Sequence, residues 1–290
     1  MCIAFSGIFY RYAEVSPSTG VVFRCLFGLP VLVAVAVIEQ RRYGPLPTAT
    51  IRLAAIAGVF FAGDLLFWHH AIEAVGAGLA TVLGNLQVLV VGFVAWAVFR
   101  ERPSRSILAA LPVVVVGVAL ISGAVGSGAY GAAPALGVVL GLATAFCYAG
   151  YLLVIRRGGR DLRRPAGPVA IATASTAAVA VLVGFVGGDL NLAPALPSLA
   201  WLAVLGLTSQ SAGYLLISLS LPRLPAVVTS MILLAQPVAS VILAMVLLRE
   251  TPSPTQLAGV ALVVGGIAVA TLPGRGRAAV TPRRSPAAGS

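Results

Sequence analysis

A small set of ionisable side chains lies inside long apolar runs of this sequence. They are Arg24, Asp64, His69, His70 and Glu73. Charged groups at such depth are costly in hydrocarbon and typically mark a binding site or an ion pathway. A carboxylate can bind a cation or carry a proton, and a guanidinium can bind a carboxylate. Asp64 and Arg24 are therefore the first candidates for substrate binding or ion coupling.

Three polar residues on different apolar runs are expected at nearly the same depth. At a helical rise of 1.5 Å per residue, Asp64 lies about 12 Å from one membrane surface. Measured from that same surface, Arg24 lies about 9 Å down and Asn85 about 12 Å down. The spacing predicts an ion pair between Arg24 and Asp64 with Asn85 nearby. The alternative is a purely structural pair that holds two helices together.

The residues that follow Asp64 divide by their direction around the helix. Trp68, at i+4, shares the face of Asp64, whereas His69 points about 140° away. His69 and His70 lie three or four residues from Glu73, a spacing that can bind a metal but supplies too few ligands alone. We expect no metal there and favour an interfacial hydrogen-bond cluster. Either histidine could titrate near neutral pH, so a proton-linked role stays open.

Two glutamines occupy corresponding positions in the two halves of the chain. Gln87 and Gln236 each fall about 15 Å into their apolar runs, near the middle of a bilayer. Transporter sites usually lie at that depth, whereas the alternative is an interhelical hydrogen bond worth about 1 kcal/mol. Gln210 and Tyr214 are further candidates for lining such a site.

The chain repeats itself at an offset of 149 residues. The segment 100–104 (Arg-Glu-Arg-Pro-Ser) returns as 249–253 (Arg-Glu-Thr-Pro-Ser), and Gly117 returns as Gly266. Internal repeats in an apolar chain are typical of membrane transporters built from two related halves. Within the repeated segment, an acidic residue followed by proline predicts a helix start, with a gating salt bridge as the alternative. The residues concerned are Glu101, Pro103, Glu250 and Pro252.

The composition excludes several classes of protein. Hydrophobic residues make up 59% of the 290 and charged residues 9%, which is far too few charges for an ordinary soluble domain. All 19 cationic residues are arginine, so neither a P-loop nor a Schiff-base cofactor is possible, and we expect no cofactor. The net charge of +11 raises nucleic acid as a partner, but the arginines sit in short loops between apolar runs. We therefore expect no nucleic acid.

The apolar runs predict an all-α membrane protein. The expected spans are 18–38, 51–73, 77–99, 105–125, 134–155, 166–188, 198–221, 225–248 and 255–272. Residues 1–12 form a further apolar stretch that is too short to cross about 30 Å of hydrocarbon. We interpret it as a shortened first helix, which makes ten transmembrane helices.

The two repeats are expected to cross the membrane in opposite senses, because each holds an odd number of helices, five. The predicted repeats cover 1–125 and 134–272, followed by a disordered basic tail at 273–290. Arginine collects in the loops on one side, so the positive-inside rule places both termini in the cytoplasm. Inverted repeats are the usual basis of alternating access.

The pattern resembles the EamA-like branch of the drug/metabolite transporter superfamily. The resemblance rests on Trp68-His69-His70, Gly76-Ala77-Gly78, Asn85-Leu86-Gln87 and the two Glu-x-Pro segments. It extends to residue 272 and fails only at the shortened first helix. It implies an exporter of small organic solutes (metabolites, amino acids or drug-like compounds) in the inner membrane.

Such a carrier would be driven by a proton or solute gradient, since no nucleotide site exists. The expected partners are the lipid bilayer, a small-molecule substrate and protons, with a homodimer left open. The rival functions are an intramembrane enzyme and a non-transporting scaffold. The sequence has no nucleophile–base or metal constellation, which disfavours an enzyme. A scaffold has no need of mid-depth polar groups in both halves.

Overall fold

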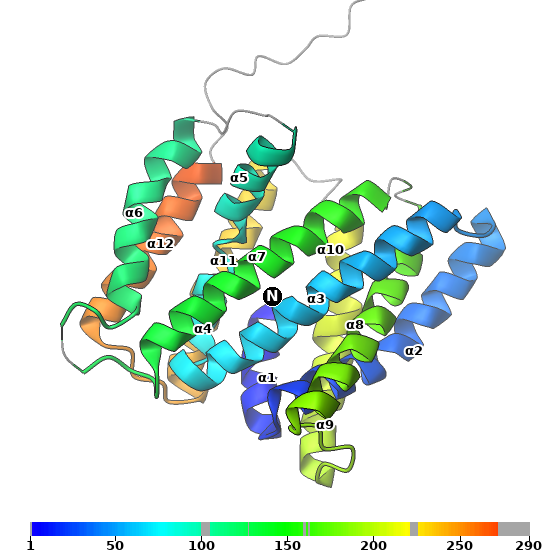
Figure 1. The fold of residues 1–290 in the computed structure, drawn as a ribbon, viewed down its shortest axis with the longest axis horizontal. Helices are drawn as coiled ribbons and strands as arrows, with labels where there is room; N and C mark the ends of the chain where they lie inside the picture. Colours follow the sequence, from blue (N-terminus) through cyan, green and yellow to red (C-terminus); the bar gives the residue numbers. More distant parts are fainter. Residues whose placement is uncertain are drawn as a thin grey trace, which may run out of the picture.

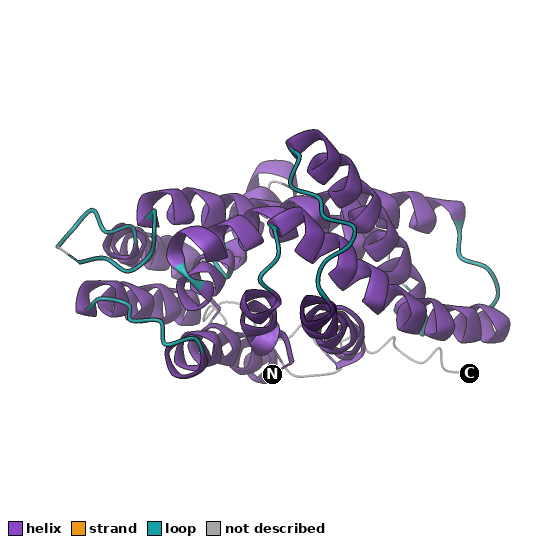
Figure 2. Cartoon of the chain, turned by 90° about the horizontal axis from the view of Figure 1, so that it is seen from below, coloured by secondary structure: helices purple, strands orange, loops and turns teal. Residues whose placement is uncertain are grey.

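The computed structural model describes residues 2–99, 105–126, 128–158, 161, 163–220 and 226–271. Glu101, Pro103 and the tail at 273–290 lie outside the described residues. Within that part of the chain the structure is helical throughout, as Figures 1 and 2 show. After a short 3-10 turn, Cys2–Phe5, the α-helices are α1 (Ser6–Ala13), α2 (Pro17–Tyr43), α3 (Thr48–Val75), α4 (Ala77–Gly84), α5 (Gln87–Phe99), α6 (Arg105–Ile121), α7 (Pro134–Gly158), α8 (Ala166–Gly187), α9 (Leu196–Leu205), α10 (Tyr214–Ser220), α11 (Ala226–Leu247) and α12 (Pro254–Thr271).

Two of the expected spans are interrupted, and counting each as one helix gives ten helices among the described residues. The predicted span 77–99 divides into α4 and α5 at Asn85 and Leu86. The span predicted at 198–221 contains α9, a π-helical segment Gly206–Gly213, and α10. Single π-helical turns inside α-helices frequently occur at functional sites. Both interruptions therefore mark places where the backbone departs from a plain membrane span.

Six helices in the described residues are long and apolar enough to cross a membrane. Their outer surface is strongly apolar, since Leu182, Phe185 and Val186 near the end of α8 are 67%, 82% and 87% exposed. A continuous surface of this kind is unfavourable in water but suits contact with lipid chains. Polar side chains instead gather inside the bundle.

The helices associate in pairs that join distant parts of the sequence. α3 packs on both α7 and α8, α2 packs on α8, and α4 packs on α11. α6 and α12 form a separate pair at one end of the molecule, while α2 and α8 lie toward the other end (Figure 1). α3 and α7 cross the middle of the bundle between these two ends.

The contact between α6 and α12 obeys the 149-residue offset. A Cβ atom on Gly117 would lie 2.8 Å from the carbonyl oxygen of Gly259 and 2.9 Å from Val263. A Cβ atom on Gly266, the counterpart of Gly117, would lie 2.4 Å from Val114, the counterpart of Val263. The two helices therefore approach each other through glycines, and each presents the same positions to the other.

α2 and α8 cap each other: each has its N-terminus capped by a carboxylate from the other helix or from the residues that follow it. Glu39, near the end of α2, accepts hydrogen bonds of 3.1 Å from the backbone N–H groups of Ala166 and Gly167 at the start of α8. Asp189, just after α8, accepts one of 3.2 Å from the N–H of Ser18 at the start of α2. Negative charge at a helix N-terminus satisfies unpaired donors and complements the helix dipole. The two helices are thus held together at both ends.

Candidate functional site

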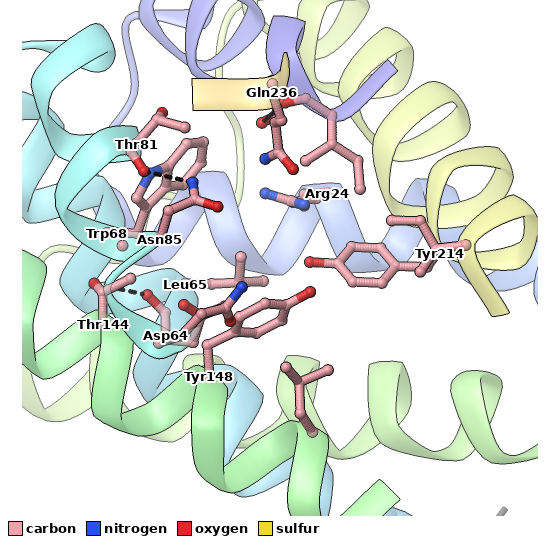
Figure 3. A pocket seen from close by; sticks show the side chains of 16 residues that line it. Arg24, Asp64, Leu65, Trp68, Thr81, Asn85, Thr144, Tyr148, Tyr214 and Gln236 are labelled. Carbon is pink, nitrogen blue, oxygen red and sulfur yellow. Dashed lines mark hydrogen bonds between the residues drawn. The ribbon is translucent and has the colours of Figure 1, made fainter. Parts of the chain in front are cut away.

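A cavity of about 150 Å³ lies in the interior between α2, α3, α4, α5, α7, α10 and α11 (Figure 3). Apolar and polar side chains both line it, and the polar ones come from helices of both halves of the chain. The lining residues are Ile3, Ser6, Arg24, Asp64, Leu65, Trp68, Thr81, Gly84, Asn85, Gln87, Thr144, Tyr148, Leu152, Tyr214, Ile217 and Gln236.

Most of the residues singled out from the sequence lie at this cavity. Those that line it are Arg24, Asp64, Trp68, Asn85, Gln87, Tyr214 and Gln236. Gln210 does not line the cavity but contacts Arg24 behind it. His69, His70 and Glu73 lie outside the lining, nearer the end of α3.

Arg24 is a buried cation that is only partly hydrogen-bonded. It is 1% exposed, and its Nε donates a 2.9 Å hydrogen bond to Oε1 of Gln210 in the π-helical segment. Gln210 in turn donates from Nε2 to Thr173 at 3.0 Å, which fixes the orientation of its amide. The guanidinium lies 6.0 Å from the ring centre of Trp68, yet its Nη1 has no hydrogen-bond partner in the described residues. Arg24 is thus oriented from behind, with donor capacity left over.

Asp64 is equally enclosed and is not paired with Arg24. The residue is 7% exposed, and its backbone carbonyl accepts a 3.4 Å hydrogen bond from Thr144. No ion pair within 4.0 Å joins Asp64 to Arg24 in the part of the chain described here. The predicted direct pair is therefore wrong, because Gln210 holds the Nε edge of the guanidinium. Both charges still face one cavity.

Asn85, Gln87 and Gln236 bring uncharged polar groups to the same place. Asn85 sits at the break between α4 and α5 and donates from Nδ2 to the carbonyl of Thr81 at 2.8 Å. The Oε1 atom of Gln87 is buried without a hydrogen-bond donor among the described residues. Gln236, its counterpart at the 149-residue offset, lines the cavity from α11. The cavity therefore offers unused acceptors as well as charges.

Aromatic side chains form one wall of the cavity, and of these Tyr214 was predicted from the sequence whereas Tyr148 was not. Tyr148 lines the cavity from α7, and Tyr214 lines it from α10. Behind them Phe61 stacks on Tyr151 at 4.6 Å and meets Tyr214 edge-on at 5.1 Å. Tyr148 and Tyr151 are three residues apart, which puts both rings on one face of α7. That spacing was readable, but nothing in it indicates which neighbour the face meets.

The histidines form a separate cluster beyond the cavity. His69 is fully buried, stacks on Tyr10 at 3.9 Å and has Nδ1 3.4 Å from the carbonyl of Pro17. Tyr10 donates a 3.1 Å hydrogen bond to Glu73, and Glu73 lies 3.7 Å from Nδ1 of His70. This arrangement resembles the expected hydrogen-bond cluster, except that His69 faces the protein interior.

Glu250 caps a different helix from the one expected. Its carboxylate accepts hydrogen bonds of 2.7 and 3.2 Å from the N–H groups of Ala77 and Gly78, at the start of α4. α12 itself begins at Pro254, beyond Pro252. Its first turn is capped by Ser253, whose Oγ accepts from the N–H of Gln256 at 3.2 Å while the Gln256 side chain accepts from the N–H of Ser253 at 3.0 Å. The sequence Ser-Pro-Thr-Gln is thus a capping box.

The buried carboxyl of Glu250 should make the stability of the protein depend on pH. Burial raises the pKa of its carboxyl, and the two backbone donors only partly offset this. A raised folded-state pKa adds stability that is complete below the unfolded value and is lost as the pH rises through the folded value. The quantity to follow is the unfolding temperature of the wild type minus that of Glu250→Gln. We expect this difference to be largest near pH 4, roughly the ordinary glutamate pKa, and to decrease toward pH 8. Thermal unfolding in detergent across this range is the measurement. If the difference in unfolding temperature instead increased with pH, the raised pKa of Glu250 would be contradicted.

A bundle of apolar helices around a partly open cavity with both apolar and polar lining is typical of multi-pass membrane proteins that transport solutes. The chain belongs to the EamA-like transporter family, which matches residues 1–123 and 135–272. This is a family of transporters and not of enzymes.

Comparison with solved structures adds support for the fold alone. One crystal structure of a protein is similar to this chain with a TM-score of 0.64 and 22% sequence identity, covering 95% of each chain. No curated protein matches the sequence. Family membership implies the lipid bilayer and a small solute as partners.

Proposed function

We propose that this protein is a secondary active transporter of the inner membrane that exports a small organic solute by alternating access. The observation that carries the proposal is the central cavity, where Arg24 and Asp64 face the same space without forming an ion pair. A structural pair would be expected to satisfy itself, whereas a binding site keeps its charges for a ligand.

We further propose that the two halves are inverted repeats. The support is the set of contacts related by the 149-residue offset. They include the glycine crossing of α6 and α12 and the cavity positions of Gln87 and Gln236. Such repeats can exchange conformations and so open one central site to either side in turn.

The inverted topology can be tested by labelling single cysteines. Arg105, at the start of α6, and Thr251, just before α12, are both exposed. In a variant without the three native cysteines, we expect Arg105→Cys to be labelled from the cytoplasm and Thr251→Cys from outside. An impermeant maleimide applied to intact cells and to inverted vesicles distinguishes the two faces. Labelling of both positions from one side would overturn the inverted arrangement.

Asp64 is our candidate for the proton-coupling group, with the cluster of His69, His70 and Glu73 as a proton-linked route from outside. Carboxylates and histidines at membrane depth form the usual proton relays of transporters. In inverted vesicles supplied with a panel of metabolites and toxins, we expect an imposed pH gradient to accelerate uptake of the transported solute.

Asp64→Asn should remove that acceleration, because asparagine cannot exchange a proton. Asp161→Asn is the control, since Asp161 lies in the loop before α8, away from the cavity lining, and pairs only with neighbouring arginines among the described residues. Uptake that stays gradient-driven in Asp64→Asn would exclude this role for Asp64.

A further inference from the structure

The cavity holds two opposite charges that are each only partly satisfied by the protein. Arg24 enters from α2 and Asp64 from α3, and Figure 3 shows the guanidinium reaching into the space beside Gln236 and Tyr214. Nη1 of Arg24 has no hydrogen-bond partner in the described residues, although the residue is only 1% exposed. No hydrogen bond from a described residue reaches the carboxylate of Asp64. The site is therefore built but incomplete.

The protein itself keeps the two charges from neutralising each other. Gln210 accepts from Nε of Arg24 and is anchored on Thr173, so the guanidinium is held on its own wall. A buried charge without a direct partner is unfavourable, and mutual attraction across the cavity offsets only part of the cost of these two. Their retention is explained if something other than the protein bridges them.

We propose that the ligand of this cavity is a small zwitterion, with its carboxylate on Arg24 and its ammonium group on Asp64. The proposal deepens the transport function given above and rests on it. A carboxylate matches the unused donor of Arg24 through charge-assisted hydrogen bonds. An ammonium group has three donors, and Gln87, which lines the same cavity as Asp64, has a buried Oε1 without a donor among the described residues.

Singly charged ligands fit the cavity less well. A monoanion would leave the Asp64 carboxyl without a partner, so that it must either stay desolvated as a charge or bind a proton. A monocation would leave Arg24 unpaired, and arginine cannot release its proton. Each such unpaired group carries its full desolvation penalty. A zwitterion pairs with both groups in their charged forms at once.

The size of the cavity limits the zwitterion further. A cavity of about 150 Å³ is comparable with one that admits benzene, so it suits about six to eight non-hydrogen atoms. That range corresponds to α-amino acids from alanine to valine. The remaining lining includes Leu65, Leu152 and Ile217, which can surround a short aliphatic side chain.

The proposal is tested by binding to the purified full-length protein in lipid nanodiscs. The probes are valine, isobutylamine and isovalerate, which share one branched aliphatic group and differ in charge. We expect valine to bind at least about tenfold more tightly than either singly charged probe, because each loses one charge-assisted contact. Equal binding of all three, or no binding of valine, would overturn the proposal.

Two variants separate binding chemistry from mere folding. Asp64→Asn should weaken valine and shift the preference toward isovalerate, whereas Arg24→Gln should shift it toward isobutylamine. A misfolded protein would lose all three probes together and could not exchange one preference for another. Arg52→Gln, an exposed arginine at the start of α3, is the matched control and should bind as the wild type does. Identical preferences in the wild type and both variants would refute the assignment.

The transport function is assessed separately from this ligand. Valine counterflow is measured in vesicles loaded with valine, beside uptake of the wider solute panel. If another solute is transported while valine does not bind, the zwitterion assignment fails and the carrier function stands. If valine binds with the expected preferences but no solute crosses, the ligand assignment stands and the carrier function fails.

Discussion

Arg24→Gln is expected to reduce the initial rate of solute flux about 100-fold or more. The substitution removes the cation that faces the cavity and leaves Asp64 as an uncompensated buried charge. Charged hydrogen bonds contribute about 1.5–3 kcal/mol each, and a guanidinium can make two of them to one carboxylate, which gives the factor of about 100. The glutamine is shorter and neutral, so it cannot restore them.

The flux is measured in reconstituted vesicles at matched amounts of inserted protein. The control is Arg52→Gln, because Arg52 is exposed and lies away from the cavity lining. We expect this control to retain the wild-type rate. Gel filtration of both variants in detergent shows whether the bundle remains folded. Wild-type flux in a folded Arg24→Gln protein would remove Arg24 from the site.

Gly259→Leu is expected to destabilise the protein by about 3 kcal/mol, which lowers its unfolding temperature by about 10 °C. A Cβ atom at this position would lie 2.6 Å from the carbonyl oxygen of Gly117 and 3.0 Å from Ile121 on α6. The obstacle is backbone, which cannot rotate aside as a side chain can. α6 and α12 would therefore have to separate.

Gly265 provides the matched control within the same helix. Nothing lies within 4 Å of a Cβ atom built there, and the residue is exposed. Gly265→Leu should therefore unfold at or above the wild-type temperature, because leucine favours a helix more than glycine does. The measurement is the fraction of protein that stays monodisperse after heating in detergent. Equal stability of the two leucine variants would mean that the close crossing of α6 and α12 does not hold the bundle together.

Depth in the membrane was the part of the site most accessible from the sequence. Arg24, Asp64 and Asn85 were expected at one level, and the structure places all three at one cavity. The reason is that the rise per residue of a helix is nearly constant, so distance along a span follows from counting. The same counting predicted Gln87 and Gln236 near the middle of the bilayer, and in the structure both line the cavity, from opposite halves of the chain.

Partners across helices could not be found by counting. The hydrogen bond from Arg24 to Gln210 joins residues 186 apart, and it depends on α2 packing against the π-helical segment. Without knowledge of that packing, the nearest opposite charge was the natural partner to propose for Arg24. Glu250 was likewise assigned to its own helix, although its acceptor oxygens reach the start of α4.

Other features were readable but passed over. The polar run at 208–211, between Gly206 and Gly213, departs from an ordinary membrane span and coincides with the π-helical segment. The capping box that begins at Ser253 predicts a start of α12 later than Pro252. Local patterns therefore carried information on helix ends, whereas the choice of neighbouring helix did not follow from them.

The reciprocal capping of α2 and α8 restricts how the cavity can change shape. Glu39 makes hydrogen bonds at one end of the helix pair and Asp189 at the other. Neither helix can therefore slide along the other without breaking these carboxylate–backbone hydrogen bonds. We expect α2 and α8 to tilt together as one rigid body. Arg24 belongs to α2 and Asp64 to α3, so a tilt of the α2–α8 pair relative to α3 would change the distance between the two charges.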